Sequence, residues 1–246
     1  MAARSAAAVI LYGRNPVREA LRGRRSVEQV IATARVAREP WLEASTVPVA
    51  LVATDDELGE LCGSGDHQGV CARAEDYPYV DSAGLLDADD ALVVCLDEIQ
   101  DPRNLGAVCR VAECVGAAGV VIGERRSAAV TAVVCRASAG AVEHLPIARV
   151  RNVTEYLNHA KGAGAWVYGA HAEATVAYDQ PDYTGKVVLV LGSEGRGLRP
   201  RVVSACDQLV ALPLRGQVGS LNVSAAAAAL LYGILHSRER PLDRAP

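Results

Sequence analysis

The sequence lacks several features that mark common classes of protein. Its 246 residues include no phenylalanine and only one methionine, so alanine, valine and leucine must fill the core. No apolar run reaches the roughly 18 residues that a membrane helix needs, which argues against a membrane protein. The apolar run at 6–12 is followed at once by Gly13-Arg14-Asn15-Pro16, without a cleavage-like site. We interpret this run as a first strand and not as a signal peptide.

Metal-binding and disulfide patterns are also missing. The seven cysteines form no CxxC pair and most lie within apolar runs, and the five histidines are scattered. This distribution favours reduced, buried thiols in a cytoplasmic protein over disulfides or a zinc site, and we expect no bound metal.

The charge is distributed unevenly along the chain. The formal net charge is −4, but residues 1–38 carry eight arginines against Glu19 and Glu28, which gives +6 there and −10 in the remainder. A basic front segment is a candidate nucleic-acid surface, although an arginine run can also be a solvated face. The length suits one domain of about 150 residues and a smaller one.

Residues 8–75 have the pattern of a small α/β unit. Short apolar runs predict strands at 9–12, 27–32, 47–52 and 70–74, with helices at 15–21, 40–45 and 55–62. Thr54 is the expected cap of the third helix. His67-Gln68-Gly69 is typical of a turn before an edge strand. The stretch 77–90, with proline, glycine and four aspartates, has the composition of a linker.

From Ala91 onward, predicted strands and helices alternate, which indicates a parallel α/β sheet. The strands are expected at 91–96, 118–122, 146–149, 165–170, 187–191 and 208–212, and the helices at 105–115, 128–139, 152–161 and 198–205. Ligands of such sheets bind at the carboxyl ends of strands, so the loops at 97–106, 192–197 and 213–222 are the candidate site. In the first loop Asn104 is a plausible helix cap. Arg110 follows six residues later, so both side chains could face one pocket.

The glycine-rich loop at 192–197 invites comparison with a dinucleotide site. Its order is G-x-x-G-x-G, whereas the pyrophosphate fingerprint is G-x-G-x-x-G, and Glu194 would place a carboxylate against the phosphates. No Gly-Lys-Ser/Thr follows, which excludes Walker-type phosphate binding. A nicotinamide site is therefore disfavoured.

The third loop leads into an alanine-rich helix. Ser220, Asn222 or Ser224 could each cap this helix. Five consecutive alanines at 225–229 let it approach another backbone closely, which suits a dimer or a tightly threaded core. The tail from Ser237 is expected to be disordered.

Three ordered motifs resemble those of the SpoU/TrmH family, RNA ribose 2′-O-methyltransferases of the SPOUT superfamily. They are Asn104 with Arg110, then LGSEGRGL at 191–198, then LP at 212–213 with SLNVS at 220–224. Residues 137–146 resemble the family's middle segment, and the likeness covers about 91–236. The front segments 12–13, 15–21 and 67–70 resemble the ribosomal-protein-like substrate-binding domain of the branch that methylates guanosine in 23S rRNA.

The resemblance implies an α/β fold in which a parallel-sheet domain carries a C-terminal trefoil knot (the SPOUT or α/β-knot fold). The implied domains are an RNA substrate-binding domain at 1–76, a linker at 77–90 and a knotted domain at 91–240. The implied cofactor is S-adenosylmethionine, held in a bent pose by backbone groups of the knot loops. The cofactor contacts are expected at Leu191, Gly192, Gly195, Leu212, Leu214, Ser220 and Leu221.

The resemblance also implies a catalytic set, which comprises Asn104, Arg110, Glu194, Ser220 and Asn222. The family assigns the counterpart of Arg110 as the base or as the group that handles the substrate phosphate. Because a free guanidinium has a pKa above about 12, clamping a phosphate and stabilising the developing alkoxide is the more defensible role. Asn104 would then orient Arg110 or the ribose, and Glu194 would anchor that network.

RNA is the expected partner, because only RNA carries the 2′-hydroxyl and DNA is excluded. RNA contacts are expected at Arg14, Arg18, Arg22, Arg24, Arg25, His67 and Gln68. A cytoplasmic homodimer paired through the knotted domain is implied, in which an arginine can serve the neighbouring subunit's site. A guanosine of 23S rRNA is the leading target; tRNA, or a non-catalytic role in ribosome assembly, remain alternatives.

Overall fold

The computed structural model describes residues 8–239, so the first seven residues of the expected front domain and the end of the tail from 240 lie outside it. The chain divides into two compact units. The first comprises the residues up to Pro78 together with Ala129–His144, and the second comprises Tyr79–Ala128 and the residues from Leu145 onward. Within residues 8–239 no helix is long and apolar enough to cross a membrane.

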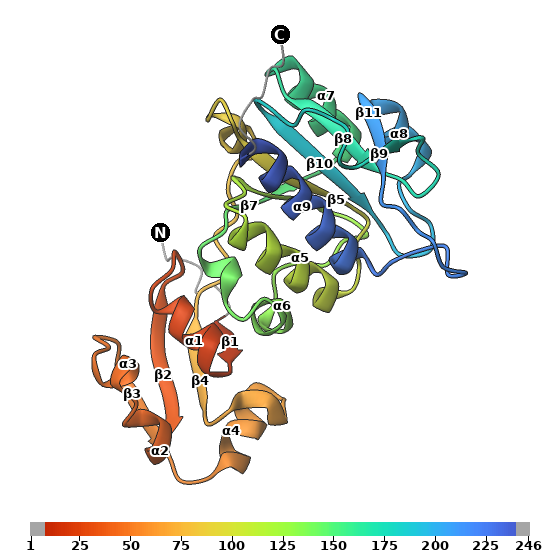
Figure 1. Ribbon diagram of the computed structural model, residues 1–246. Helices are drawn as coiled ribbons and strands as arrows, with labels where there is room; N and C mark the ends of the chain where they lie inside the picture. Colours follow the sequence, from red (N-terminus) through yellow and green to blue (C-terminus); the bar gives the residue numbers. More distant parts are fainter. Residues whose placement is uncertain (1–7, 240–246) are drawn as a thin grey trace. The chain divides into compact units, whose positions relative to one another are not determined.

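The first unit contains a four-stranded sheet (Figure 1) in the order β1-β4-β2-β3. The strands are β1 (Val9–Tyr12), β2 (Val27–Thr33), β3 (Val49–Val52) and β4 (Val70–Ala74). β4 pairs antiparallel with both β1 and β2. The expectation that the strand after His67 lies at an edge is therefore wrong, because this strand is flanked on both sides.

Short helices connect the strands of this sheet. They are α1 (Arg14–Ala20), α2 (Ala34–Ala37), α3 (Pro40–Glu43) and α4 (Asp55–Cys62). The predicted cap of α4 is confirmed, because the Thr54 hydroxyl accepts a hydrogen bond from the Glu57 amide at 3.3 Å. Acidic residues follow in the first turn of α4, where they favour the positive end of the helix dipole.

The segment Ala129–His144 completes the first unit although it follows a strand of the second unit, β6 (Gly119–Gly123), in sequence. Its helix α6 (Ala132–Ala137) packs against β1. Within the same unit, Arg25 and Glu143 form a buried ion pair of 3.1 Å, and the Arg25 guanidinium lies over the ring of Tyr77. A buried ion pair needs both partners in place, because either charge left unpaired in the protein interior costs several kcal/mol. The pair therefore ties this segment to the front of the chain.

The second unit is built on a seven-stranded parallel sheet with the order β7-β6-β5-β10-β8-β11-β9. The strands are β5 (Leu92–Asp97), β6 (Gly119–Gly123), β7 (Ile147–Val150), β8 (Trp166–Ala170), β9 (Val176–Ala177), β10 (Val187–Gly192) and β11 (Gln208–Ala211). All six predicted strands are present within a residue or two of their expected bounds. The two-residue β9 was not predicted, because a bridge this short leaves no periodic signal.

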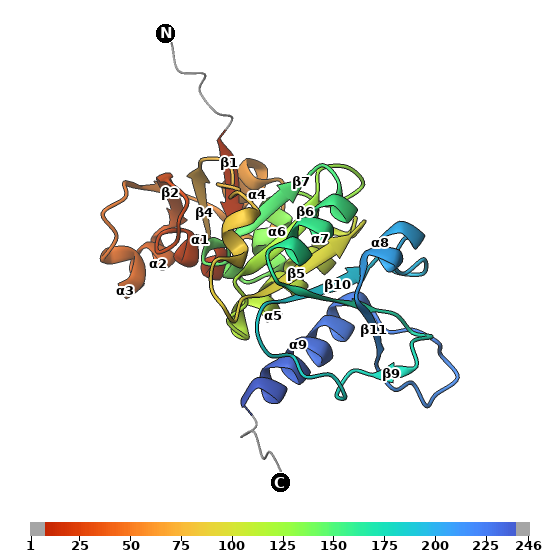
Figure 2. The same ribbon diagram turned by 90° about the horizontal axis from the view of Figure 1, so that it is seen from above.

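Helices cover both faces of this sheet (Figures 1 and 2). The helices are α5 (Pro102–Cys114), α7 (Val153–Gly162), α8 (Pro200–Ala205) and α9 (Val223–Glu239). α5 and α9 lie side by side on one face, while α7 and α8 cover the other. Residues 237–239 of the tail expected to be disordered continue α9.

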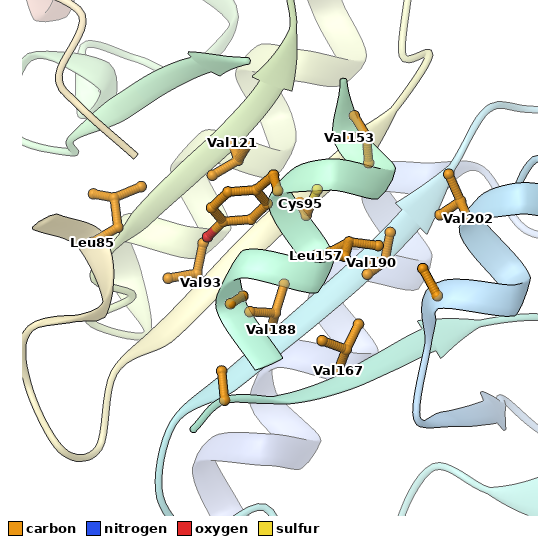
Figure 3. Packing of buried hydrophobic residues seen from close by; sticks show 14 of the residues in the cluster. Leu85, Val93, Cys95, Val121, Val153, Leu157, Val167, Val188, Val190 and Val202 are labelled. Atoms are coloured by element: carbon orange, nitrogen blue, oxygen red, sulfur yellow. The ribbon is translucent and has the colours of Figure 1, made fainter. Parts of the chain in front are cut away.

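The core of the second unit is mostly aliphatic, with buried tyrosines such as Tyr156 as its aromatic members. Figure 3 shows Leu157 of α7 beside Val167 of β8 and Val188 and Val190 of β10, which belong to the same buried cluster. These strands have no polar face, which is why their sequences are unbroken apolar runs. The expected linker belongs partly to this core, because Leu85 and Leu86 of a 3₁₀ turn (Ala83–Leu86) are buried in it.

Candidate active site

A cavity of about 540 Å³ opens at the carboxyl ends of β10, β8 and β11. All seven residues expected to contact the cofactor line it: Leu191, Gly192, Gly195, Leu212, Leu214, Ser220 and Leu221. Three segments that are distant in sequence therefore meet at one edge of the sheet. This is the edge at which parallel α/β sheets bind ligands.

The wall of this cavity is formed largely by backbone and aliphatic groups. Ser193 and Gly197 exchange two backbone hydrogen bonds of 3.2 and 2.9 Å, which closes the glycine-rich loop into a tight turn. A Cβ atom on Gly192 would lie 2.2 Å from the carbonyl carbon of Gly197, so only glycine fits there. Leu191, Leu212 and Leu230 supply apolar surface. An adenine ring read by main-chain amides and carbonyls suits such a wall.

A smaller polar cavity of about 230 Å³ adjoins the first and shares Ser193, Glu194, Arg196 and Val223 with it. Asn104 Nδ2 donates a hydrogen bond of 3.0 Å to Glu194 Oε1. The Asn222 side-chain amide donates to the same carboxylate oxygen and, at 3.0 Å, to Asn104 Oδ1. Three of the five expected catalytic residues therefore form one hydrogen-bonded cluster.

The position of Asn104 corrects one expectation. Asp101, not Asn104, caps α5, because its carboxylate accepts from the Arg103 amide at 2.8 Å and Pro102 occupies the first helical position. Asn104 lies inside the first turn, where its side chain is free to reach Glu194. Asn222 does cap α9, with its Oδ1 accepting from the Ser224 amide at 2.8 Å.

The other two expected catalytic residues are placed differently. Ser220 lines the larger cavity. Arg110 is exposed on α5 and lines none of the cavities found at this edge. Six residues correspond to a rotation that leaves Arg110 about 120° around the helix from Asn104. Within one chain the two side chains thus do not face one pocket.

Asp97 and Arg199 form a further part of this edge that sequence reasoning missed. Asp97, the fully buried last residue of β5, accepts from the backbone amide of Arg199 at 3.0 Å and from its Nε at 2.8 Å. The hydrogen bond to Asp97 raises the pKa of Arg199, so the guanidinium stays charged. This pair fixes the exit of the glycine-rich loop. The signal in the sequence that could have indicated this pair is an aspartate at the end of a buried apolar strand.

The residues expected to bind RNA lie in the first unit and differ in exposure. Arg22 and Arg24 are exposed, while Arg14 and Arg18 are partly exposed and pair with Glu39 and Glu19. Gln68 Oε1 accepts hydrogen bonds from the Arg14 amide and from Arg136.

Two residues of that set are buried in this structure. His67 accepts from the Gly69 amide at 3.1 Å, which shapes the turn before β4. Arg25 is held by Glu143, so it is not available to contact RNA, and we correct the expectation for this residue. No cluster of metal-ligating side chains occurs among the described residues.

Comparison with known proteins identifies the family. Residues 91–232 match the SpoU rRNA Methylase family, and residues 10–80 match the RNA 2′-O ribose methyltransferase substrate-binding domain. The chain belongs to the SpoU family. An "Uncharacterized tRNA/rRNA methyltransferase" of Mycolicibacterium vanbaalenii is 39% identical, with 93% of this chain and 76% of the relative covered. A similarly named Mycobacterium tuberculosis protein, Rv3579c, is 39% identical over 95% and 76% of the two chains.

Solved structures agree with this assignment. The SpoU methyltransferase AviRb from Streptomyces viridochromogenes superposes with a TM-score of 0.81 at 25% identity, covering 94% of this chain and 90% of AviRb. Its complex with AdoMet gives a TM-score of 0.79 with the same identity and coverage. The expected fold class, the SPOUT α/β fold with a small N-terminal domain, is therefore confirmed.

The family membership confirms the expected cofactor. This SpoU methyltransferase takes its methyl group from S-adenosylmethionine and acts on tRNA or rRNA. The cavity's apolar, backbone-lined wall fits that group, whereas a carboxylate beside a pyrophosphate would not fit a dinucleotide.

Proposed function

We propose that this protein methylates a ribose 2′-hydroxyl of RNA, with a guanosine of 23S rRNA as the leading target. The observation that carries the proposal is the Asn104–Glu194–Asn222 cluster, in which Glu194 lines both the cofactor cavity and the adjoining polar cavity. The front unit, which matches a family of substrate-binding domains named for this reaction, supports the ribose as acceptor. tRNA is an equally open alternative as the RNA class.

The proposed division of labour follows the positions of the residues. S-adenosylmethionine supplies an electrophilic methyl group when bound. The backbone at Gly192, Leu212 and Leu221 holds the donor, while Leu191 and Leu214 exclude water from its apolar part. The polar cluster orients the ribose so that its 2′-oxygen comes to about 3 Å from the methyl carbon. This positioning supplies a large part of the rate enhancement.

Arg110 is proposed to clamp the substrate phosphate and to stabilise the developing alkoxide. A guanidinium keeps its proton at neutral pH and forms two parallel hydrogen bonds to a phosphate, so it is a better clamp than a base. Because Arg110 lies away from the polar cluster of its own chain, we propose that it serves the site of a partner in a homodimer. Val218 and Leu221, before α9, and Tyr232, within α9, leave exposed apolar surface that a partner would cover.

The RNA-reading surface is proposed to lie on the first unit, within the front domain expected at 1–76. Arg22 and Arg24 are its exposed cations, with Arg14, Arg18 and Gln68 beside them. The expected knotted domain at 91–240 then holds the cofactor. We place the reaction in the cytoplasm, in keeping with seven free cysteines.

The reaction is tested by incubating the protein with labelled S-adenosylmethionine and either unmodified 23S rRNA or a tRNA pool. A 2′-O-methyl group blocks alkaline cleavage at its own linkage, so the product should contain an alkali-resistant dinucleotide. Label that is released as a methylated base after complete hydrolysis would contradict the ribose assignment. The RNA that accepts label decides between rRNA and tRNA.

The role of Arg110 is tested by complementation between two inactive variants. Arg110→Ala should lose methyl transfer but still bind cofactor, and Asn104→Ala should behave in the same way. If Arg110 serves the partner's site, mixed dimers of the two variants regain one complete site and measurable activity. If it serves its own site, every site in the mixture lacks one residue and the mixture stays inactive.

A further inference from the structure

A second large cavity, of about 710 Å³, lies in the second unit at the same edge of the sheet and is lined by five arginines. They come from three separate connections: Arg125 and Arg126 follow β6, Arg151 follows β7, and Arg199 and Arg201 begin α8. We call this cavity the arginine pocket. None of its five arginines belongs to the sequence motifs or to the expected RNA-binding set.

The charges of the arginine pocket are only partly balanced. Arg199 is neutralised by buried Asp97. Arg126 has a 3.5 Å contact with Glu98 and Arg151 a 3.8 Å contact with Glu124, but the two arginine side chains are 74% and 91% exposed. Ion pairs this exposed contribute little and exchange easily for a better partner.

Arg125 and Arg201 add two further positive charges to the arginine pocket. Both are exposed, and within residues 8–239 neither has an ion-pair partner. Four arginines thus stand ready for an anion at one concave surface. Planar guanidinium groups match phosphate oxygens in pairs, which makes an arginine cluster a phosphate site more than a site for a lone carboxylate.

A buried hydroxyl in the same cavity also lacks a partner. Ser127 lines the arginine pocket, and its Oγ is buried without a hydrogen bond to any described residue. A buried hydroxyl left unpaired is unfavourable, so a ligand oxygen in the pocket would satisfy it. This second observation is independent of the charge.

The arginine pocket is the third in a row of cavities along the carboxyl edge. The sheet order places the cofactor cavity over β11, β8 and β10, the polar cavity over β10 and β5, and the arginine pocket over β5, β6 and β7. Glu98 lines both the polar cavity and the arginine pocket. Neighbouring strands are about 4.8 Å apart, so β6 and β7 lie roughly 10 and 14 Å from β10. An RNA strand whose ribose occupies the polar cavity would place a neighbouring backbone phosphate at the arginine pocket.

We propose that the arginine pocket binds a backbone phosphate of the substrate RNA next to the nucleotide being methylated. The inference rests on the proposed function for the class of substrate and adds a contact on the catalytic unit itself. Arg125 and Arg201 make the principal contacts, and Ser127 Oγ donates a hydrogen bond to a phosphate oxygen. The contact carries no sequence information; it sets the register of the strand.

The test uses the full chain and a short, fluorescein-labelled, mixed-sequence single-stranded RNA. Affinity is measured by fluorescence anisotropy across a salt series for the wild type and for Arg125→Gln/Arg201→Gln. Losing the contact to one phosphate lowers the magnitude of the slope of log K against log salt by about 0.7, so affinity should fall about fourfold near 0.15 M salt.

A matched control removes the same charge from the opposite edge of the same sheet. Lys161 lies in the last turn of α7 and Lys186 precedes β10, so both lie at the amino edge. Lys161→Gln/Lys186→Gln should keep the wild-type slope. Equal slopes for the arginine variant and the wild type overturn the proposal, and so does an equal loss in the two double variants, because that result reflects net charge alone.

Two further measurements distinguish a failure of this proposal from a failure of the proposed methyltransferase function. If the wild type transfers no methyl group to RNA, the proposed function fails, yet the anisotropy comparison still decides the arginine pocket. If methyl transfer occurs and the arginine variant binds RNA as the wild type does, the arginine pocket alone is overturned. In a third outcome, inorganic phosphate protects the wild type but not the arginine variant from thermal unfolding, while the two proteins bind RNA with equal affinity. The pocket would then hold an adventitious ion only, and the proposal would be overturned.

Discussion

Asn104 donates a 3.0 Å hydrogen bond to the carboxylate of Glu194, ninety residues later in the chain. The first residue belongs to α5 and the second to the glycine-rich loop after β10, and Asn222 before α9 closes the cluster. Two amides directed at one carboxylate oxygen hold its negative charge in a single place. The cluster therefore links helix α5, the glycine-rich loop and the segment before α9 at the smaller polar cavity.

The first prediction concerns this cluster. Glu194→Ala removes the acceptor of two amide hydrogens, and we expect kcat to fall about 100-fold because the ribose loses its alignment. The dissociation constant for S-adenosylmethionine, measured by calorimetry, should change only a few-fold. Asn104→Ala should have the same effect. The kcat of the double variant Asn104→Ala/Glu194→Ala should be no lower than that of the less active single variant, since the residues act as a unit. Strictly multiplicative losses would show that they act separately.

The second prediction concerns the tight turn at Gly192. A methyl group there would collide with the backbone of Gly197, which cannot yield as a flexible side chain would. Gly192→Ala should therefore displace the glycine-rich loop and weaken cofactor binding at least tenfold. Gly216→Ala is the control, because a Cβ at that position meets no atom within 4 Å. Equal cofactor affinities in the two variants would show that the loop adapts.

The third prediction concerns acid stability in the first unit. Burial opposes ionisation of Glu19, but hydrogen bonds from His144 and Arg18 and the charges of Arg18 and Arg22 outweigh it and lower its pKa below 4.5. A lowered pKa stabilises the folded state above about pH 4.5, and this stability is lost as the pH falls through the folded-state pKa. The free-energy difference between the wild type and Glu19→Gln, measured by urea unfolding, should shrink from about pH 6 to pH 3.

The control for that measurement is Glu28→Gln. Glu28 is exposed, and no ion pair is found for it among the described residues. Its effect on the free energy of unfolding should be small across the whole range. A pH-independent effect of Glu19→Gln would show that packing, and not charge, underlies its contribution.

The fourth prediction concerns cysteine reactivity. Burial raises the pKa of Cys71, Cys135 and Cys206 to about 12, so almost no thiolate is present at neutral pH. Cys114 is exposed at the end of α5. Iodoacetamide should therefore modify Cys114 first in the native protein, and Cys114→Ser should remove the fast phase seen by mass spectrometry. Rapid modification of Cys135 in the native state would show that the Arg25–Glu143 region opens readily.

Local patterns in the sequence predicted most of the elements, because periodicity and capping are local properties. The strand that ends in Gly192 and the cap at Thr54 are examples. The start of α5 was misjudged even though the local signal was present: Asp101 followed by Pro102 is a stronger helix start than Asn104. Motif resemblance, more than periodicity, brought the cofactor-cavity residues together.

What the sequence could not supply is contact between distant segments. Nothing local indicates that Arg25 would be buried against Glu143, 118 residues later, or that β4 would be flanked by two strands. The arginine pocket was missed for the same reason, because its cations come from three connections whose proximity depends on the order of the strands.

The segment Ala129–His144 gives the first unit a discontinuous sequence. A fragment ending at Pro78 would leave Arg25 buried without its carboxylate and β1 without the helix that packs on it. Grafting this substrate-binding module onto another methyltransferase therefore requires three junctions, near residues 78, 129 and 144. Evolutionary exchange of RNA specificity by simple fusion at the N-terminus would meet the same obstacle.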